Sequence, residues 1–155
     1  MPPFEIENLN SLKQFEGREF PAIDWLVVTQ DRIQKFADAT EDRQWIHLDS
    51  ERAQRESPFG GTVAHGFLTL SLLSYWVKQA IHIRSGLAMS VNYGLNKVRF
   101  PAPLRVGTLV RARVRLLSVK ESAEFIDATF LVHVESESSA KPCCVAEWLV
   151  RYYVL

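Results

Sequence analysis

Asp42 and His47 place a carboxylate and an imidazole five residues apart, in a polar stretch without clear periodicity. Loops can turn two such side chains toward one point, and catalytic groups are often carried by loops for this reason. Imidazole titrates near neutral pH, so it can accept or release a proton, and a nearby carboxylate can share a water molecule with it. The pair therefore suggests acid–base chemistry on bound water. The same spacing also suits a turn-capping aspartate beside a structural histidine.

A metal site is a third interpretation of Asp42 and His47. It requires further ligands, and the sequence supplies none at a recognisable spacing. We therefore predict no metal.

A glycine-rich turn, 57–61, leads into the most apolar segment of the chain, Thr62–Ile81. Unpaired N–H groups in the first turn of a helix carry partial positive charge and can stabilise an oxyanion. Gly66 lacks a Cβ, so a ligand carbonyl oxygen can approach its N–H closely. The alternative is a tight turn with close helix packing, in which His65 is a hydrogen-bonded core histidine.

A third segment, 91–103, ends at two prolines. It is either a plain edge strand or one wall of a ligand tunnel. In the second interpretation, Asn92 or Tyr93 contacts the ligand.

The N-terminal half must position these groups. We expect a surface helix or arm over Met1–Glu16, a first strand over Glu19–Val28, and a helix capped by Thr29. Glu41–Gly61 reads as irregular. Thr62–Ile81 reads as one helix, apolar nearly all round and so buried on most sides.

The C-terminal half predicts three strands, because apolar and polar residues alternate with a period of two. Such alternation indicates antiparallel strands packed on one face only. The expected inward residues are Val110, Ala112, Val114 and Leu116, then Ile126, Ala128, Phe130, Val132 and Val134, then Ala146, Trp148, Val150, Tyr152 and Val154. A sheet wrapped around one buried helix is an α+β domain, and the order of elements favours a hot-dog fold.

Length and composition limit the partners. The 155 residues suit one domain, and 18 basic against 18 acidic residues argue against nucleic acid as the main partner. Thr62–Ile81 contains His65 and Lys78, which disfavours a membrane span. We expect no signal peptide and a cytoplasmic location, with the adjacent Cys143 and Cys144 reduced.

Three segments together resemble the MaoC-like family, the (R)-specific enoyl-CoA hydratases, and its nodulation protein N-like branch. The family's Asp-x-Asn-Pro-x-His motif is similar to residues 42–47, which read Asp-Arg-Gln-Trp-Ile-His. Residues 64–68, Ala-His-Gly-Phe-Leu, resemble the family's helix entry. Residues 57–61, Ser-Pro-Phe-Gly-Gly, and 92–100, Asn-Tyr-Gly-Leu-Asn-Lys-Val-Arg-Phe, are similar to the nodulation protein N-like branch.

The resemblance implies roles for particular residues. Asp42 and His47 match the catalytic pair, Gly66 matches the residue whose N–H holds the thioester oxygen, and Ser74 matches a serine lining the site. Gln44 departs from the family's asparagine but keeps an amide.

Gln44, His65, Ser74, Asn92 and Tyr93 are the residues expected to bind substrate. The resemblance also implies a homodimer whose sheets join edge to edge, with CoA bound near the interface.

The expected activity is addition of water to a trans-2-enoyl thioester, or its reversal. It needs no redox cofactor or metal, and the acyl group is carried by CoA or an acyl-carrier protein. Two alternatives stay open on the same fold. One is a thioesterase that hydrolyses acyl-CoA, and the other is an acyl-binding protein without activity.

Overall fold

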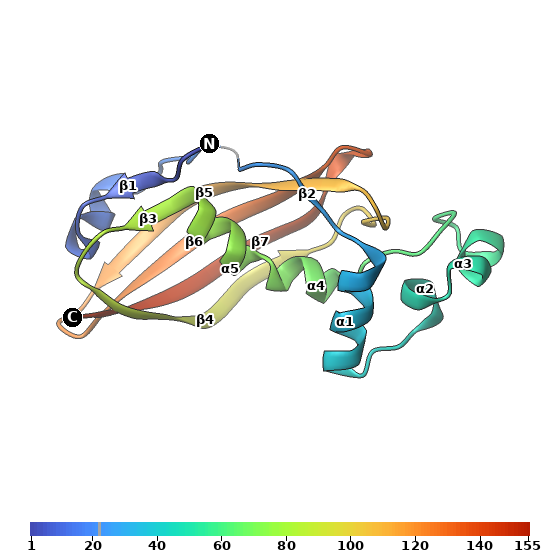
Figure 1. The fold of residues 1–155 in the computed structure, drawn as a ribbon. Coiled ribbons are helices and arrows are strands. Elements are labelled where there is room, and N and C mark those ends of the chain that lie inside the picture. The colour runs from blue at the N-terminus through green and yellow to red at the C-terminus, as the bar shows by residue number, and fades with distance from the viewer. Residues whose placement is uncertain (22) are drawn as a thin grey trace.

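A five-stranded antiparallel sheet is the largest element of the computed structural model, which describes residues 1–21 and 23–155 (Figure 1). The strand order is β2-β5-β6-β7-β4. The strands span Leu26–Val27 (β2), Leu109–Glu121 (β5), Phe125–Ser136 (β6), Ser139–Val154 (β7) and Leu87–Arg99 (β4). Each pair of neighbours is antiparallel, as the alternating pattern predicted.

The inward face of the sheet carries the residues that the period-two pattern selected. All of them are buried except Val154, which is half-buried. Large side chains such as Phe130 lie in this core, and the outward face carries charged residues such as Arg111, Arg113 and Glu135. The prediction of three half-buried strands is confirmed.

Two helices, α4 (Gly66–Ser71) and α5 (Leu73–Ala80), run one after the other along the concave face of the sheet (Figure 1). Trp76 of α5 is fully buried. A curled antiparallel sheet wrapped around a helix is the α+β hot-dog fold, so the predicted fold class is confirmed.

The prediction of one continuous buried helix over Thr62–Ile81 was wrong in two respects. Residues 62–65 are extended because their backbone groups pair with neighbouring loops, and the helix is interrupted at Leu72. Phe67 and Tyr75 are 67% and 44% exposed, so the helices leave one side open.

The N-terminal segment belongs to the core, which corrects the expectation of a surface helix or arm. Strand β1 (Phe4–Ile6) pairs in parallel with β3 (Ile81–Ile83). It is followed by a 3₁₀ helix, η1 (Leu9–Phe15), whose Leu9 and Leu12 are fully buried. A few large apolar side chains therefore anchor a mostly polar segment.

The expected first strand, Glu19–Val28, is mostly irregular. Only β2 and an isolated bridge between Glu19 and Arg115 pair with β5, and Ala22 lies outside the described residues. The predicted cap is confirmed, because the Thr29 side chain accepts a hydrogen bond from the N–H of Arg32 at the start of α1 (Gln30–Thr40).

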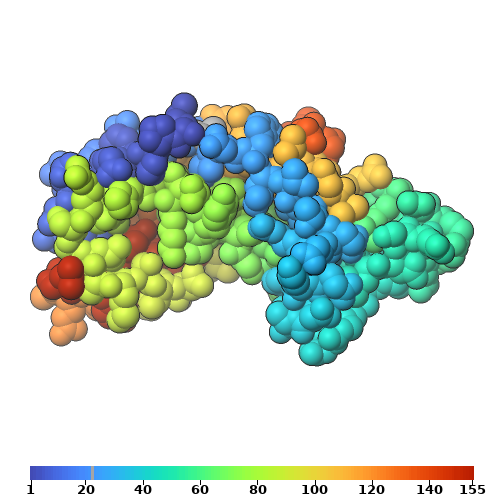
Figure 2. Space-filling view, in the orientation of Figure 1, coloured from blue at the N-terminus to red at the C-terminus, as the bar shows by residue number. Residues whose placement is uncertain are grey.

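Residues 41–61, which we call the overhang, project from one end of the sheet (Figures 1 and 2). This segment was expected to be irregular, yet it contains two short helices, α2 (Trp45–Leu48) and α3 (Ser50–Glu56). None of the described helices is long and apolar enough to cross a membrane.

Candidate active site

Four residues selected from the sequence line one cavity beneath the overhang. Asp42 and His47 come from the overhang, and His65 and Gly66 come from the entry to α4. The cavity has a volume of about 380 Å³. Its other lining residues are Phe36, Thr40, Phe67 and Phe100. The fold thus brings together groups that are far apart in the sequence.

Extended residues 62–65 hold His47 in place. The N–H of Val63 donates to the Ile46 carbonyl at 3.0 Å, and the N–H of Ala64 donates to the Leu104 carbonyl at 2.8 Å. The same segment receives the His47 ring, because Nδ1 lies 2.6 Å from the Val63 carbonyl oxygen. His47 is therefore fixed by both its backbone neighbours and its side chain.

Gln30 braces the same histidine from the first turn of α1. Its Nε2 donates to the His47 carbonyl oxygen at 2.7 Å, and its Oε1 accepts from the Thr62 hydroxyl at 2.6 Å. Sequence analysis missed Gln30 and Thr62, because nothing in the local pattern indicates contacts 17 and 32 residues away.

The hydrogen bond to Val63 determines which His47 nitrogen can act as a base. A carbonyl oxygen only accepts, so Nδ1 carries the proton and donates it. In the neutral ring Nε2 then keeps its lone pair. Burial is the main factor that lowers the pKa of His47 below its ordinary value of 6.5, and the nearby His65 ring lowers it further. The neutral, basic form is therefore favoured.

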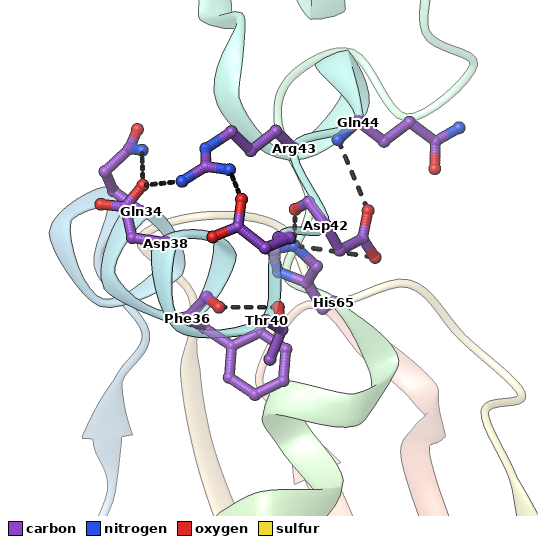
Figure 3. A network of polar contacts seen from close by, with 9 residues as sticks. Gln34, Phe36, Asp38, Thr40, Asp42, Arg43, Gln44 and His65 are labelled. Carbon is purple, nitrogen blue, oxygen red and sulfur yellow. Dashed lines mark hydrogen bonds and ion pairs between the residues drawn. The ribbon is translucent and has the colours of Figure 1, made fainter.

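Asp42 lies on the solvent side of the cavity, with its side chain 54% exposed. It follows Glu41, which ends α1 in the left-handed conformation with φ 64° and so turns the chain into the overhang. Arg43 pairs with Asp38 and Glu41 and ties this turn back to α1 (Figure 3). The Asp42 carboxylate can thus reach solvent while its backbone is held.

The side chains of Asp42, His47 and His65 form a compact cluster. One ligand atom from each residue lies within 4.8 Å of the others. A water molecule makes hydrogen bonds of about 2.8 Å, so it can span a carboxylate oxygen and an imidazole nitrogen at such a separation. The cluster is therefore suited to holding and deprotonating one water molecule.

The same three residues provide the set of metal-binding groups that the sequence did not suggest. The chemistry of His65 argues against that use. Its Nε2 lies 2.9 Å from the Asp42 carbonyl oxygen, so this nitrogen carries a proton and has no lone pair for a metal. Its Nδ1 is buried away from solvent.

Gly66 begins α4 at the wall of the cavity. A Cβ at this position would lie 3.1 Å from the ring of Phe100, so the close packing also explains the glycine. Its N–H is in the first turn of the helix, where no intrahelical acceptor exists. Both interpretations of Gly66 from the sequence therefore have a structural basis.

The other predicted substrate-binding residues lie outside this cavity within one chain. The Gln44 side chain extends away from His65 (Figure 3). Ser74 and Asn92 border two neighbouring cavities of about 600 and 370 Å³ between α5 and β4, and Tyr93 borders the smaller one. The Tyr93 ring packs 3.9 Å from the Arg151 guanidinium.

A curled sheet around a helix, with an aspartate and a histidine facing the helix entry, defines a hot-dog protein with a candidate acid–base site. The family model of the MaoC like domain matches residues 12–138. The 3-hydroxyacyl-thioester dehydratase Z of Mycobacterium tuberculosis is 48% identical over 148 residues, covering 95% of this chain and 97% of its own. This chain belongs to the MaoC-like family.

Two further matches agree with this assignment. Nodulation protein N of Rhizobium leguminosarum bv. viciae is 44% identical over 134 residues, which cover 86% of this chain and 83% of that protein. The crystal structure of a MaoC-like dehydratase from Rhodospirillum rubrum superposes with a TM-score of 0.72 at 21% identity, covering 96% of this chain and 97% of that chain. At that identity the superposition supports the fold alone.

Proposed function

We propose that the protein is an (R)-specific enoyl-thioester hydratase, a hydro-lyase that also dehydrates 3-hydroxyacyl thioesters. The observation that carries the proposal is the cavity in which Asp42 and His47 can share one water molecule beside the N–H of Gly66. The relative that is 48% identical is a 3-hydroxyacyl-thioester dehydratase, which supports the same reaction.

In the proposed reaction, Asp42 and His47 hold the water while His47 Nε2 removes its proton. The water oxygen bonds to C3 of the trans-2-enoyl thioester, and the π electrons of the C2–C3 bond shift to give an enolate. The Gly66 N–H stabilises the charge on the thioester oxygen. The proton then returns to C2 from the same pair, so the product is the 3-hydroxyacyl thioester.

The substrate is proposed to be a thioester of CoA or of an acyl-carrier protein. The proposed steps add water across the C2–C3 double bond with no net change of oxidation state, and His47 activates the water, so they require neither a redox cofactor nor a metal. Burial raises the pKa of Cys143 to about 11 and that of Cys144 to about 12, which keeps both as unreactive thiols. Reduced buried cysteines are compatible with the cytoplasmic location that we propose.

Direct assay tests the activity. The purified protein is incubated with crotonyl-CoA and with longer enoyl-CoA substrates, and loss of the conjugated enoyl absorbance is followed. We expect hydration to the (R)-3-hydroxyacyl-CoA, identified by chiral analysis. Release of free CoA thiol without hydration would instead indicate a thioesterase, and binding without turnover would indicate an inactive acyl-binding protein.

The proposal includes a homodimer formed through β4. This strand is the edge of the sheet and pairs only with β7 among the described residues. Its exposed side chains include Met89, Val91, Tyr93 and Leu95, which are between 39% and 55% exposed. A long apolar edge is prone to pairing with another strand, and a second copy offers a self-complementary one.

Charge on this edge should separate the dimer. We expect the double variant Met89→Lys and Val91→Lys to sediment as a monomer, because the twofold axis brings like charges together. The control carries Asn10→Lys and Gln14→Lys on the exposed side of η1 and should stay dimeric. A wild-type monomer, or a dimer that survives the β4 substitutions, would contradict the interface.

The pH dependence follows from the lowered pKa of His47. Activity requires its neutral form, so we expect the acidic limb of the kcat/KM profile to lie below pH 6.5.

The stability of the fold should follow the same histidine. The pKa of His47 is lower in the folded protein than in the unfolded chain, so the neutral ring makes its full contribution to the free energy of unfolding above about pH 6.5. That contribution is lost as pH falls through the folded pKa. An NMR titration of the His47 ring checks the assignment, and a midpoint above 6.5 would oppose it.

A further inference from the structure

His65 adjoins Asp42, His47 and Gly66 in the candidate site, and its side chain is almost completely buried, at 3% exposed. Its ring stacks on that of His47, with centroids 3.8 Å apart and planes 23° apart. Its Nε2 donates to the Asp42 backbone carbonyl at 2.9 Å (Figure 3). It also directly precedes Gly66 in the chain. One imidazole thus links the aspartate, the catalytic histidine and the proposed oxyanion donor.

The hydrogen bonds give the two stacked histidines opposite tautomers. His47 is protonated on Nδ1 and His65 on Nε2, because each of these nitrogens faces a carbonyl oxygen. The Nδ1 atom of His65 is buried and has no hydrogen-bond partner among the described residues. The Nε2 proton is committed to the Asp42 carbonyl, and Nδ1 has no described group with which to exchange a proton.

We propose that His65 is a positioning residue, which fixes the separation of Asp42, His47 and Gly66 while staying out of the proton transfer itself. This inference rests on the proposed hydratase function. The Asp42 side chain is half exposed, and Arg43 ties the neighbouring turn to α1, while the hydrogen bond from His65 Nε2 to the Asp42 carbonyl oxygen holds Asp42 itself beside the two rings. The flat ring sets the plane of His47 at the same time.

The role differs from the substrate-binding one expected from the sequence. The Phe36 ring packs against the His65 ring at a centroid distance of 5.0 Å, and His65 is 3% exposed, so little of its ring is presented to a ligand in the cavity that it borders. Loss of its function should therefore reduce kcat and leave KM little changed. Small displacements of catalytic groups can cost about 10²-fold in rate.

Two substitutions separate the hydrogen bond from the stacking. His65→Phe keeps a flat ring and loses the donor, and we expect kcat for crotonyl-CoA hydration to fall about 10²-fold. His65→Gln restores an N–H donor and should recover most of that loss. The control Ile33→Val removes one buried methyl group from α1, away from the cavity, and should lower stability without lowering kcat.

A long-range ¹H–¹⁵N spectrum of the histidine rings provides a readout that does not depend on turnover. We expect the Nε2–H tautomer for His65 and the Nδ1–H tautomer for His47 in the wild type. In His65→Phe, the resonances of His47 and of the Asp42 backbone should shift.

The outcomes distinguish the two proposals. Wild-type kcat in folded His65→Phe, or the Nδ1–H tautomer at His65, would overturn the positioning role. Failure of wild-type protein to hydrate any enoyl thioester would instead overturn the proposed function, whatever the tautomers.

Discussion

Asp42→Asn and His47→Gln are each expected to lower kcat for crotonyl-CoA hydration by about 10²–10⁴-fold. The asparagine cannot take part in proton transfer, and the glutamine lacks a nitrogen that can accept a proton at neutral pH. Because both groups act on one water molecule, the double variant should lose little more than the worse single variant. Initial rates and circular dichroism on the same samples measure activity and folding together.

The matched controls for this pair are Asp31→Asn on the surface of α1 and His133→Gln on the outer face of the sheet. Both residues are exposed and lie outside the cavity, so both variants should keep wild-type kcat. Near-native hydration by folded Asp42→Asn and His47→Gln would show that the acid–base assignment is wrong. Losses that multiply fully in the double variant would show that the two residues act separately.

Gly66→Pro is the second substitution with a large expected effect, because it deletes the proposed oxyanion donor. Proline is well tolerated at the first position of a helix. The preceding His65 already has φ −57° and ψ 135°, the extended conformation that a following proline requires. Removal of one such donor costs about 10²–10³-fold in kcat.

Gly66→Ala is the control for added bulk at the same position. Its Cβ meets the Phe100 ring at 3.1 Å as the proline Cβ does, but the N–H is retained. We therefore expect the alanine variant to be slower than wild type because Phe100 must shift, and the proline variant to be much slower than the alanine variant. Equal kcat values for the two variants would rule out the Gly66 N–H as the donor.

The C-terminal sheet could be predicted from the sequence because the alternation of apolar and polar residues that specifies each strand lies within that strand. Val110 to Leu116 and Ile126 to Val134 alternate so regularly that one register alone buries the apolar residues. The cap at Thr29 was equally local. Hydropathy did not separate residues 62–65 from the helix that follows, because extended and helical segments are equally apolar when both are buried. Only their pairing with the overhang and with residues 104–106 makes them extended.

The sequence by itself determined the hot-dog fold, through periodicity along the strands, and selected Asp42 and His47 as the candidate acid–base pair that the structure brings to one cavity. Tertiary structure alone decided how that pair is held. Gln30 and His65 donate to backbone carbonyls of the overhang across 17 and 23 residues, and Thr62 donates to Gln30 across 32 residues. A backbone carbonyl is present at every residue, so no pattern of side chains could indicate which carbonyls would accept these hydrogen bonds.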